Sequence, residues 1–240
     1  MKKEIRVLDK GFVRLLDTLG GDAGVVNAAR VSYAGTSKGE AKDQALIAYL
    51  LKHQHLTPFE HAVLKFHVKC PIFVARQWFR HRWASYNEVS YRYTQTAEEF
   101  YVPETWRRQD TKNKQGSLRA EGVDQAELTK VYRGALERSF EAYKALLDAG
   151  VAREMARMAL PVALYTEFYW TINARSLINF LSLRADAHAQ SEIQAYAEAL
   201  ASFFQETMPW TYAAFLKHLW KGENARFGSE REKLCASSPS

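Results

Sequence analysis

The side chains best suited to chemistry gather in residues 76–93, R-Q-W-F-R-H-R-W-A-S-Y-N-E-V-S-Y-R-Y. Four arginines, a histidine, a glutamate, an asparagine and two serines stand among six aromatic residues. Guanidinium groups and hydroxyls bind phosphate oxygens, and aromatic rings stack on flat heterocycles. The segment therefore predicts a binding site for an anionic partner with rings, either a phosphorylated small molecule or a nucleic acid.

The spacing within this segment indicates two kinds of backbone. Pro71 suits the first turn of a helix over about 71–82, in which Gln77 and Arg80 are three residues apart and share a face. After Ala84 the helical periodicity is lost, so the following residues are expected to form an ordered loop. Such a loop offers backbone N–H groups, hydroxyls and Arg92 to a phosphate. A plainer interpretation, open on composition alone, is an arginine-rich helix with solvated or acid-paired charges.

The order of residue types is far more specific than their number. Residues 80–93, R-H-R-W-A-S-Y-N-E-V-S-Y-R-Y, resemble the signature of the flavin-dependent thymidylate synthases, R-H-R-x-x-S-x-N-E-x-S-x-R-Y, with every fixed position matched. Residues 53–61, 70–80 and 173–190 also resemble segments of this family, and the resemblance covers about residues 4–220. It implies a methyltransferase that converts dUMP to dTMP. Its cofactor would be FAD, with NADPH as reductant and methylenetetrahydrofolate as carbon donor. A cytoplasmic location is expected separately, because the basic first residues lack the apolar stretch of a signal peptide.

The resemblance also implies two sets of binding residues. The flavin set comprises Thr57, Arg80, His81, Arg82, Glu88, Asn173, Arg175 and Asn179. The dUMP set comprises Gln77, Arg80, Glu88, Ser90, Arg92, Arg157 and Arg184, with the arginines directed mainly at the phosphate. His55 is expected near the flavin and the folate.

Arg184 is the residue to which the resemblance gives the most direct catalytic role. A guanidinium stays protonated in proteins, so it can stabilise negative charge that develops on a uracil ring. The competing interpretation is a helix-surface arginine paired with Asp186 or Glu192.

A metal site and a protein nucleophile are both alternatives that the residues raise. His53, His55, Glu60 and His61 match no common zinc spacing, and no bound metal is expected. Ser90 would need a base within hydrogen-bond reach to attack uracil, and Cys70 lies in an apolar stretch that raises a thiol's pKa. We therefore expect a reaction that needs no nucleophile from the protein.

The elements that must position these residues predict an α+β fold, with a small antiparallel sheet packed against a predominantly helical set in a single domain. Strands are expected over 4–17, with a turn at Gly11, and over 62–69. Helices are expected at about 22–32, capped by Asp22, and at 39–53, 71–82, 124–149, 151–160, 172–186, 188–205 and 209–220. A polar excursion is expected over 103–123. The enzyme domain would span 1–220, followed by a flexible tail, 221–240.

Helical geometry separates the candidate residues of the segment 173–190. In one unbroken helix Arg175 and Asn179 lie roughly opposite Arg184, while Asn173 points the same way as Arg184. Either Asn173 precedes the helix, or the helix lies between sites of different subunits. The second arrangement agrees with the family, whose members are homotetramers with active sites assembled from several chains, and a homotetramer is expected here.

Composition limits the remaining function classes. Hydrophobic residues make up 47% of the 240-residue chain, without an apolar run long enough to span a membrane. The two cysteines form no C-x-x-C pair, and G-x-G-x-x-G is absent, so FAD would be held without a Rossmann turn. The net charge of +6 and the aromatic residues also suit a nucleic-acid-binding protein. That class leaves the motif unexplained, so no nucleic-acid partner is expected.

Overall fold

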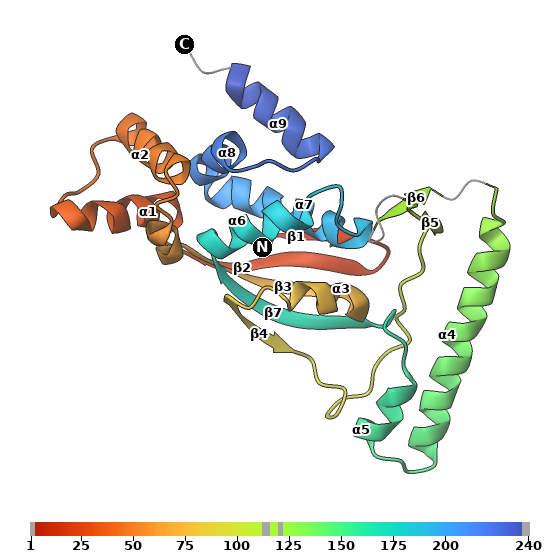
Figure 1. Cartoon of the computed structure of the whole chain (residues 1–240). Helices are drawn as coiled ribbons and strands as arrows, with labels where there is room; N and C mark the ends of the chain where they lie inside the picture. The colour runs from red at the N-terminus through yellow and green to blue at the C-terminus, as the bar shows by residue number, and fades with distance from the viewer. Residues whose placement is uncertain (1–2, 112–115, 120–121, 237–240) are drawn as a thin grey trace.

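The computed structural model describes residues 3–111, 116–119 and 122–236. Its centre is a five-stranded antiparallel sheet in the order β1-β2-β3-β7-β4. The strands are β1 (Glu4–Val7), β2 (Gly11–Leu19), β3 (Val63–Pro71), β4 (Ala84–Glu88) and β7 (Tyr165–Asn173). The helices pack mainly on one face of this sheet (Figure 1), so the predicted α+β class is confirmed.

Strand β3 has the one-sided burial that its alternating sequence predicts. Leu64, Phe66 and Val68 are at most 1% exposed, whereas Lys65 on the other face is exposed. Along its whole length β3 pairs with β7, from Val63 opposite Asn173 to Pro71 opposite Tyr165. Strand β7 is not among the predicted strands, and its last two residues fall in the helix predicted over 172–186.

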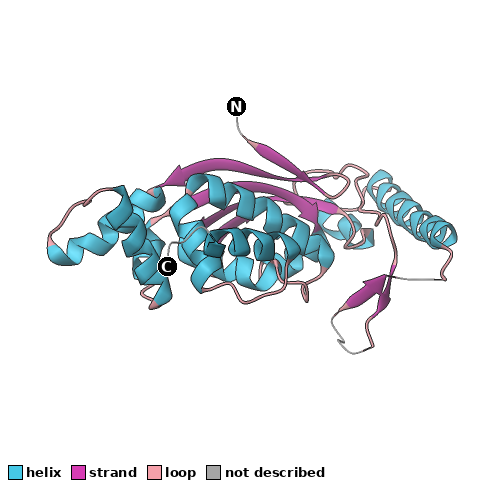
Figure 2. Ribbon diagram, turned by 90° about the horizontal axis from the view of Figure 1, so that it is seen from above, coloured by secondary structure: helices cyan, strands magenta, loops and turns pink. Residues whose placement is uncertain are grey.

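Helices α6, α7 and α8 lie over the sheet, with α1 and α2 at one end of it (Figures 1 and 2). The helices of this part of the fold are α1 (Gly21–Arg30), α2 (Glu40–Lys52), α3 (Ile72–Trp78), α6 (Ala174–Arg184), α7 (Ser191–Thr207) and α8 (Pro209–His218). Short 3-10 turns lie at Val31–Tyr33 and Thr57–His61. The core between the layers is aromatic: Trp78 packs at 5.1 Å from Trp170 and 4.9 Å from Phe180, ring centroid to ring centroid. Removing such rings from water is the main stabilising contribution here.

A helical arm projects from the other end of the sheet (Figure 1). It consists of α4 (Gln125–Asp148), α5 (Arg153–Ala156) and a 3-10 turn, Arg157–Ala159, around a second apolar cluster that includes Leu136, Phe140 and Tyr143. Helix α4 confirms the predicted helix at 124–149, and the Asp124 side chain caps it by accepting a hydrogen bond from Glu127 N. The predicted helix at 151–160 is replaced by the shorter α5 and the turn.

Two segments expected to be irregular have regular structure. In the polar stretch 103–123, β5 (Arg107–Gln109) pairs with β6 (Ser117–Arg119), while residues 112–115 and 120–121 lie outside the described part. After α8, residues expected to be a flexible tail form α9 (Ala225–Ala236), with Phe227 fully buried. The tail expectation is therefore wrong for α9, because the apolar Phe227 anchors it, and residues 237–240 are not described.

Three local predictions near the functional motifs are also wrong. Helix α3 ends at Trp78 rather than at about residue 82, so Arg80 lies just beyond it. The expected loop after Ala84 begins instead with β4, which pairs with β7. Asp22 lies inside α1 and does not cap it; its carboxylate accepts bonds from the backbone N–H groups of Trp210 and Thr211 and so caps α8.

Candidate active site

The boundary between β7 and α6 determines how the side chains of the segment 173–190 are oriented. Asn173 is the last residue of the strand, and its side chain accepts a hydrogen bond from Ser176 N at 2.9 Å, which caps α6. Of the two arrangements that the sequence left open, Asn173 precedes the helix. Arg175 and Arg184 are nine residues apart on α6 and therefore project to opposite sides.

Each side of α6 borders its own hollow. The first hollow, of about 660 Å³, contains four of the predicted flavin residues: His81, Asn173, Arg175 and Asn179. Leu56, Trp83, Ile172 and Ile178 supply apolar wall. An apolar wall with a few amide and guanidinium donors suits a flat, polar-edged ring.

The second hollow, of about 1080 Å³, lies on the Arg184 side of α6. It contains Gln77, Arg80 and Arg184 from the predicted dUMP set, together with Arg76. The side chains of Gln77 and Gln190 are hydrogen-bonded to each other across this hollow. Ser182, Leu219 and Lys221 border both hollows, so the two are neighbours.

Arg184 and His81 connect the two hollows. The Nε of Arg184 donates a hydrogen bond to Nε2 of His81 at 3.0 Å, and a guanidinium nitrogen reaches the carbonyl oxygen of Gln77 at 3.4 Å. Burial and the nearby Arg184 cation lower the pKa of His81 to about 4. Burial and the charge of Arg80 also lower the pKa of Arg184. At neutral pH the imidazole is therefore neutral and can accept the bond from the cation.

The cations of the second hollow have no acidic partners in the described part of the chain. Arg76, Arg80 and Arg184 form no ion pair there. Of the two acids that the alternative interpretation offered to Arg184, Asp186 lines the same hollow but pairs with His188 at 2.6 Å, and Glu192 pairs with Arg107 at 2.8 Å. The ion-pair interpretation of Arg184 is therefore wrong, and the described lining of the hollow carries an excess of positive charge.

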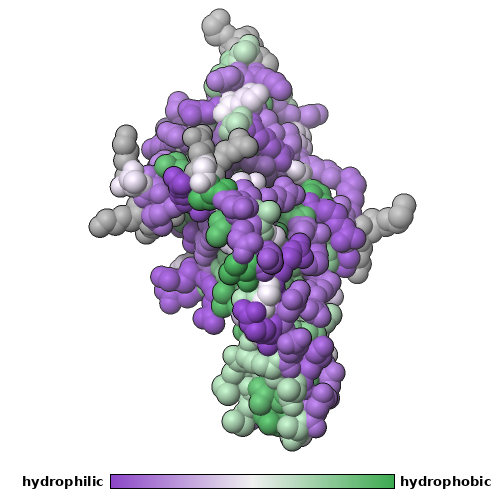
Figure 3. All heavy atoms as spheres, turned by 90° about the vertical axis from the view of Figure 1, so that its right-hand side faces the viewer, coloured by the Kyte–Doolittle hydropathy of each residue, from purple (hydrophilic) through white to green (hydrophobic). Residues whose placement is uncertain are grey.

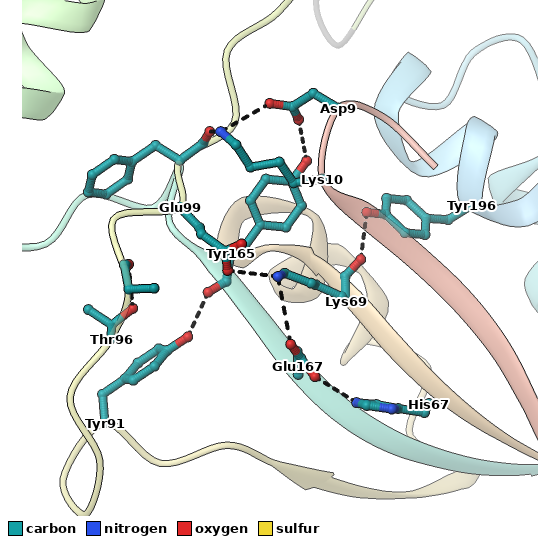
Figure 4. A network of polar contacts seen from close by, with 12 residues as sticks. Asp9, Lys10, His67, Lys69, Tyr91, Thr96, Glu99, Tyr165, Glu167 and Tyr196 are labelled. Carbon is teal, nitrogen blue, oxygen red and sulfur yellow. Dashed lines mark hydrogen bonds and ion pairs between the residues drawn. The ribbon is translucent and has the colours of Figure 1, made fainter. Parts of the chain in front are cut away.

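Glu88 lies apart from both hollows, at the end of β4. It accepts a hydrogen bond from the buried Thr166 at 2.7 Å. It borders a third hollow, of about 520 Å³, on the outer face of the sheet. Figure 4 shows the polar network beside it, in which Lys69 contacts Glu99 at 2.7 Å and Glu167 at 3.8 Å.

This network fixes the loop that follows β4. The Tyr91 hydroxyl donates to the carbonyl oxygen of Tyr165 at 2.6 Å, and Val89 N donates to the carbonyl oxygen of Glu167 at 2.9 Å. The loop also touches the arm, because Arg92 pairs with Glu154 at 3.4 Å. Arg157, one turn further along, is exposed. Ser90, Arg92 and Arg157 thus form a group of their own, outside the first two hollows.

Besides Ser90, Arg92 and Arg157, three further predicted residues border none of the three hollows within the described chain. They are His55, Thr57 and Arg82, which are all exposed, although Gln54 and Leu56 beside the first two line the first hollow. One monomer therefore presents the predicted residues on several surfaces rather than in one pocket.

Among the described residues, no base is hydrogen-bonded to the hydroxyl of the candidate nucleophile Ser90. The contact formed by Ser90 Oγ is with the N–H of Arg92 at 3.4 Å; neither His81 nor Glu88 is bonded to it. Cys70 is fully buried, and burial raises the pKa of its thiol well above the ordinary value. In residues 3–111, 116–119 and 122–236, no three His, Cys, Asp or Glu side chains converge as metal ligands.

Several residues that line the hollows have no predicted role. Gln190 is the last residue of the family-like segment 173–190, and its place there is a signal that could have marked it. Trp83 is 87% exposed and forms part of the wall of the first hollow. Lys221 follows the last predicted helix, where no pattern in the chain marked it.

A sheet covered by helices, with adjoining hollows whose guanidinium groups form no ion pair within the described chain except Arg175 with Glu60, has the chemistry to accept an anionic ring compound. Among the helices of the described residues, none has the length and apolar character needed to span a membrane.

Comparison with known proteins specifies the class. The model of the family described as "Thymidylate synthase complementing protein" matches residues 14–210. The chain is 53% identical over 229 residues to the flavin-dependent thymidylate synthase of Thermosipho africanus, covering 94% of this chain and 99% of that one. It is 53% identical over 218 residues to the enzyme of the same name from Thermus thermophilus, covering 91% and 80%. The crystal structure of a UMP/dUMP methylase, PolB from Streptomyces cacaoi bound with 5-Br UMP, has a TM-score of 0.81 at 36% identity, covering 91% of this chain and 99% of that one.

The chain therefore belongs to the family of flavin-dependent thymidylate synthases, as the motif at 80–93 indicated.

Proposed function

We propose that this protein methylates dUMP to dTMP, with reduced FAD as hydride source and methylenetetrahydrofolate as carbon donor. The observation that carries the proposal is the group of unpaired cations around Arg184 beside an apolar-walled hollow. The names of the relatives support the same reaction. NADPH is the proposed reductant, and the cytoplasm is the proposed location.

The first hollow fits a flavin in its donor chemistry. Asn173 and Asn179 offer amides to the polar edge of a ring system, and Ile178 offers apolar contact to its face. Arg175 is paired with Glu60 and would exchange that carboxylate for a pyrophosphate. The proposed flavin residues are Thr57, Arg80, His81, Arg82, Glu88, Asn173, Arg175 and Asn179. When bound and reduced, FAD would supply the hydride.

The second hollow fits the pyrimidine of dUMP. Arg184 is held by His81 and by the Gln77 carbonyl, so its guanidinium has a fixed position. A fixed cation stabilises the charge that develops on a uracil when N3 loses a proton, because it needs no reorganisation during the reaction. The proposed dUMP residues are Gln77, Arg80, Glu88, Ser90, Arg92, Arg157 and Arg184.

The proposal includes no nucleophile from the protein. The support is the absence of a base at Ser90 in the described chain and the buried thiol of Cys70. The residues of the site then orient and polarise the substrate. His55 is proposed to lie on the folate side.

Assembly as a homotetramer would bring the separated groups together. Arg157 on the arm and Arg184 on α6 share no hollow within one chain. The arm also exposes apolar side chains, with Met155, Met158 and Val162 each more than half exposed. Figure 3 shows hydrophobic residues gathered on the lower end of this arm. Such a patch is typical of a contact surface, so we propose that active sites form between subunits.

The experiment is an assay of dTMP formation from dUMP by the purified protein, with FAD, NADPH and methylenetetrahydrofolate present. We expect dTMP in the complete mixture and none when the folate is omitted. The matched control is Arg184→Ala, which should bind FAD but form dTMP far more slowly than the wild type. A protein that binds FAD and dUMP but forms no dTMP under any of these conditions would contradict the proposal.

A further inference from the structure

The segment after α8 borders both hollows. Leu219 and Lys221 line the first and the second hollow, and Gly222 lines the second. This segment lies outside residues 14–210, which the family model matches. It is therefore a part of the site that the shared motifs leave unassigned.

The backbone of this segment is fixed against the end of α6. Glu223 N donates to Oδ2 of Asp186 at 3.0 Å, and its carbonyl oxygen accepts from Ala187 N at 2.7 Å. The Asn224 side-chain amide donates to the carbonyl oxygen of Ala185 at 2.9 Å. Trp220, which is 2% exposed, anchors the other side. The backbone of Lys221 consequently has a defined position.

The charge of Lys221 has no partner in the part of the chain that the structure describes. Its ammonium group forms no ion pair there, and the side chain is exposed. Arg80 and Arg184 in the adjoining hollow are likewise unpaired. Asp186 also lines the second hollow, but its carboxylate is already bonded to His188 and to Glu223 N. Cations that line one hollow repel one another, and these three outnumber that carboxylate, so they favour a further anionic group beside Lys221, at the boundary of the two hollows.

We propose that Lys221 binds phosphate oxygens at this boundary, from either the pyrophosphate of FAD or the monophosphate of dUMP. The inference rests on the proposed function, because that function supplies both ligands. An ammonium is a flexible point charge with three donors, which suits a phosphate approached from the side.

The test compares Lys221→Met with Lys42→Met in the full-length protein. Lys42 is also an exposed lysine, but it lies on α2 and lines neither hollow. The dissociation constants of FAD and of its phosphate-free counterpart riboflavin are measured by fluorescence. Those of dUMP and deoxyuridine are measured by calorimetry on the FAD-loaded protein.

We expect Lys221→Met to weaken the binding of one phosphorylated ligand about tenfold, with its phosphate-free counterpart unchanged. A change for FAD assigns the pyrophosphate, and a change for dUMP assigns the monophosphate. Lys221→Arg should retain most of the affinity. Equal affinities in Lys221→Met and Lys42→Met for all four ligands would overturn the inference while leaving the proposed function intact. A wild-type protein that binds neither FAD nor dUMP would overturn both.

Discussion

Arg184 donates a hydrogen bond from Nε to the Nε2 of His81, across a distance of 3.0 Å. Arg184 is the last residue of α6, and His81 follows α3. The bond therefore joins the segments 173–190 and 80–93 through two residues that are 103 positions apart. It requires a neutral imidazole, because a protonated ring has no acceptor. This bond fixes the guanidinium that we propose to act on the uracil.

The first prediction concerns the pH dependence of stability. The pKa of His81 is lowered from 6.5 to about 4, so between these values the unfolded chain binds more protons than the folded one. Stability from the neutral His81 should be fully present above about pH 6.5 and be lost as the pH falls toward 4. Urea unfolding at several pH values measures this, with His81→Gln as control because glutamine does not titrate. An unchanged pH profile in His81→Gln would contradict the prediction.

The second prediction concerns Arg184 itself. Arg184→Ala should lower kcat/KM for dUMP by about a hundredfold or more, because the fixed cation is removed. Arg184→Lys keeps the charge but loses the planar donors, and should also be strongly impaired. Steady-state kinetics with dUMP measures the effect, and retained FAD binding shows that the fold is intact. Near-wild-type turnover in Arg184→Ala would remove this residue from the mechanism.

The third prediction concerns Ser90. Because no base in the described part of the chain is bonded to its hydroxyl, Ser90→Ala should retain dTMP formation, with a modest rise in the KM for dUMP. The assay of dTMP formation measures both quantities. Complete loss of activity in a variant that still binds dUMP and FAD would instead indicate a serine nucleophile.

The fourth prediction concerns the cap that α1 supplies to α8. Asp22 is 8% exposed and accepts bonds from Trp210 N, Thr211 N and the Thr211 hydroxyl. Asp22→Ala should lower the free energy of unfolding by about 1–2 kcal/mol. Asp22→Asn keeps an acceptor oxygen and should lose less. A free energy of unfolding in Asp22→Ala equal to that of the wild type, measured in urea, would show that the cap contributes nothing.

The fifth prediction concerns the last helix. Phe227 is fully buried and lies 4.8 Å from Trp220, ring centroid to ring centroid. Phe227→Ala should cost about 3–5 kcal/mol, and α9 should lose its protection in amide hydrogen exchange. Ser229→Ala, at an exposed position on α9, is the matched control. Rapid amide exchange over α9 in the wild type would contradict this prediction and would show that the segment is a flexible tail.

Periodicity revealed the parts of the fold that have one buried face. The alternation of apolar and polar residues around Phe66 predicts β3. The same alternation at Phe168, Trp170 and Ile172 is typical of a strand and could have predicted β7. Strand β4 is different, because its residues are polar and largely exposed at the edge of the sheet. Its pairing with β7 depends on tertiary contacts that no local pattern encodes.

The motifs identified the family, and helical geometry correctly placed Arg175 and Arg184 on opposite sides of α6. Sequence spacing could not show that Arg157 lies on an arm away from both hollows. It also could not show that Lys221 borders them, because the turn after α8 is positioned by contacts with the distant Asp186. Long-range contacts of this kind depend on the packed structure rather than on local sequence.

The central claim is that groups separated on one chain converge between chains to form the active site. Mixing two variants tests it most directly: Arg184→Ala, changed in the second hollow, and Arg157→Ala, changed on the arm, each of which we expect to be strongly impaired alone. The two are unfolded together, refolded into mixed oligomers, and assayed for dTMP formation. We predict that the mixture regains a clear fraction of wild-type activity, because some sites then combine Arg184 of one subunit with Arg157 of another. A mixture as inactive as either variant alone, in oligomers shown to contain both, would contradict the account.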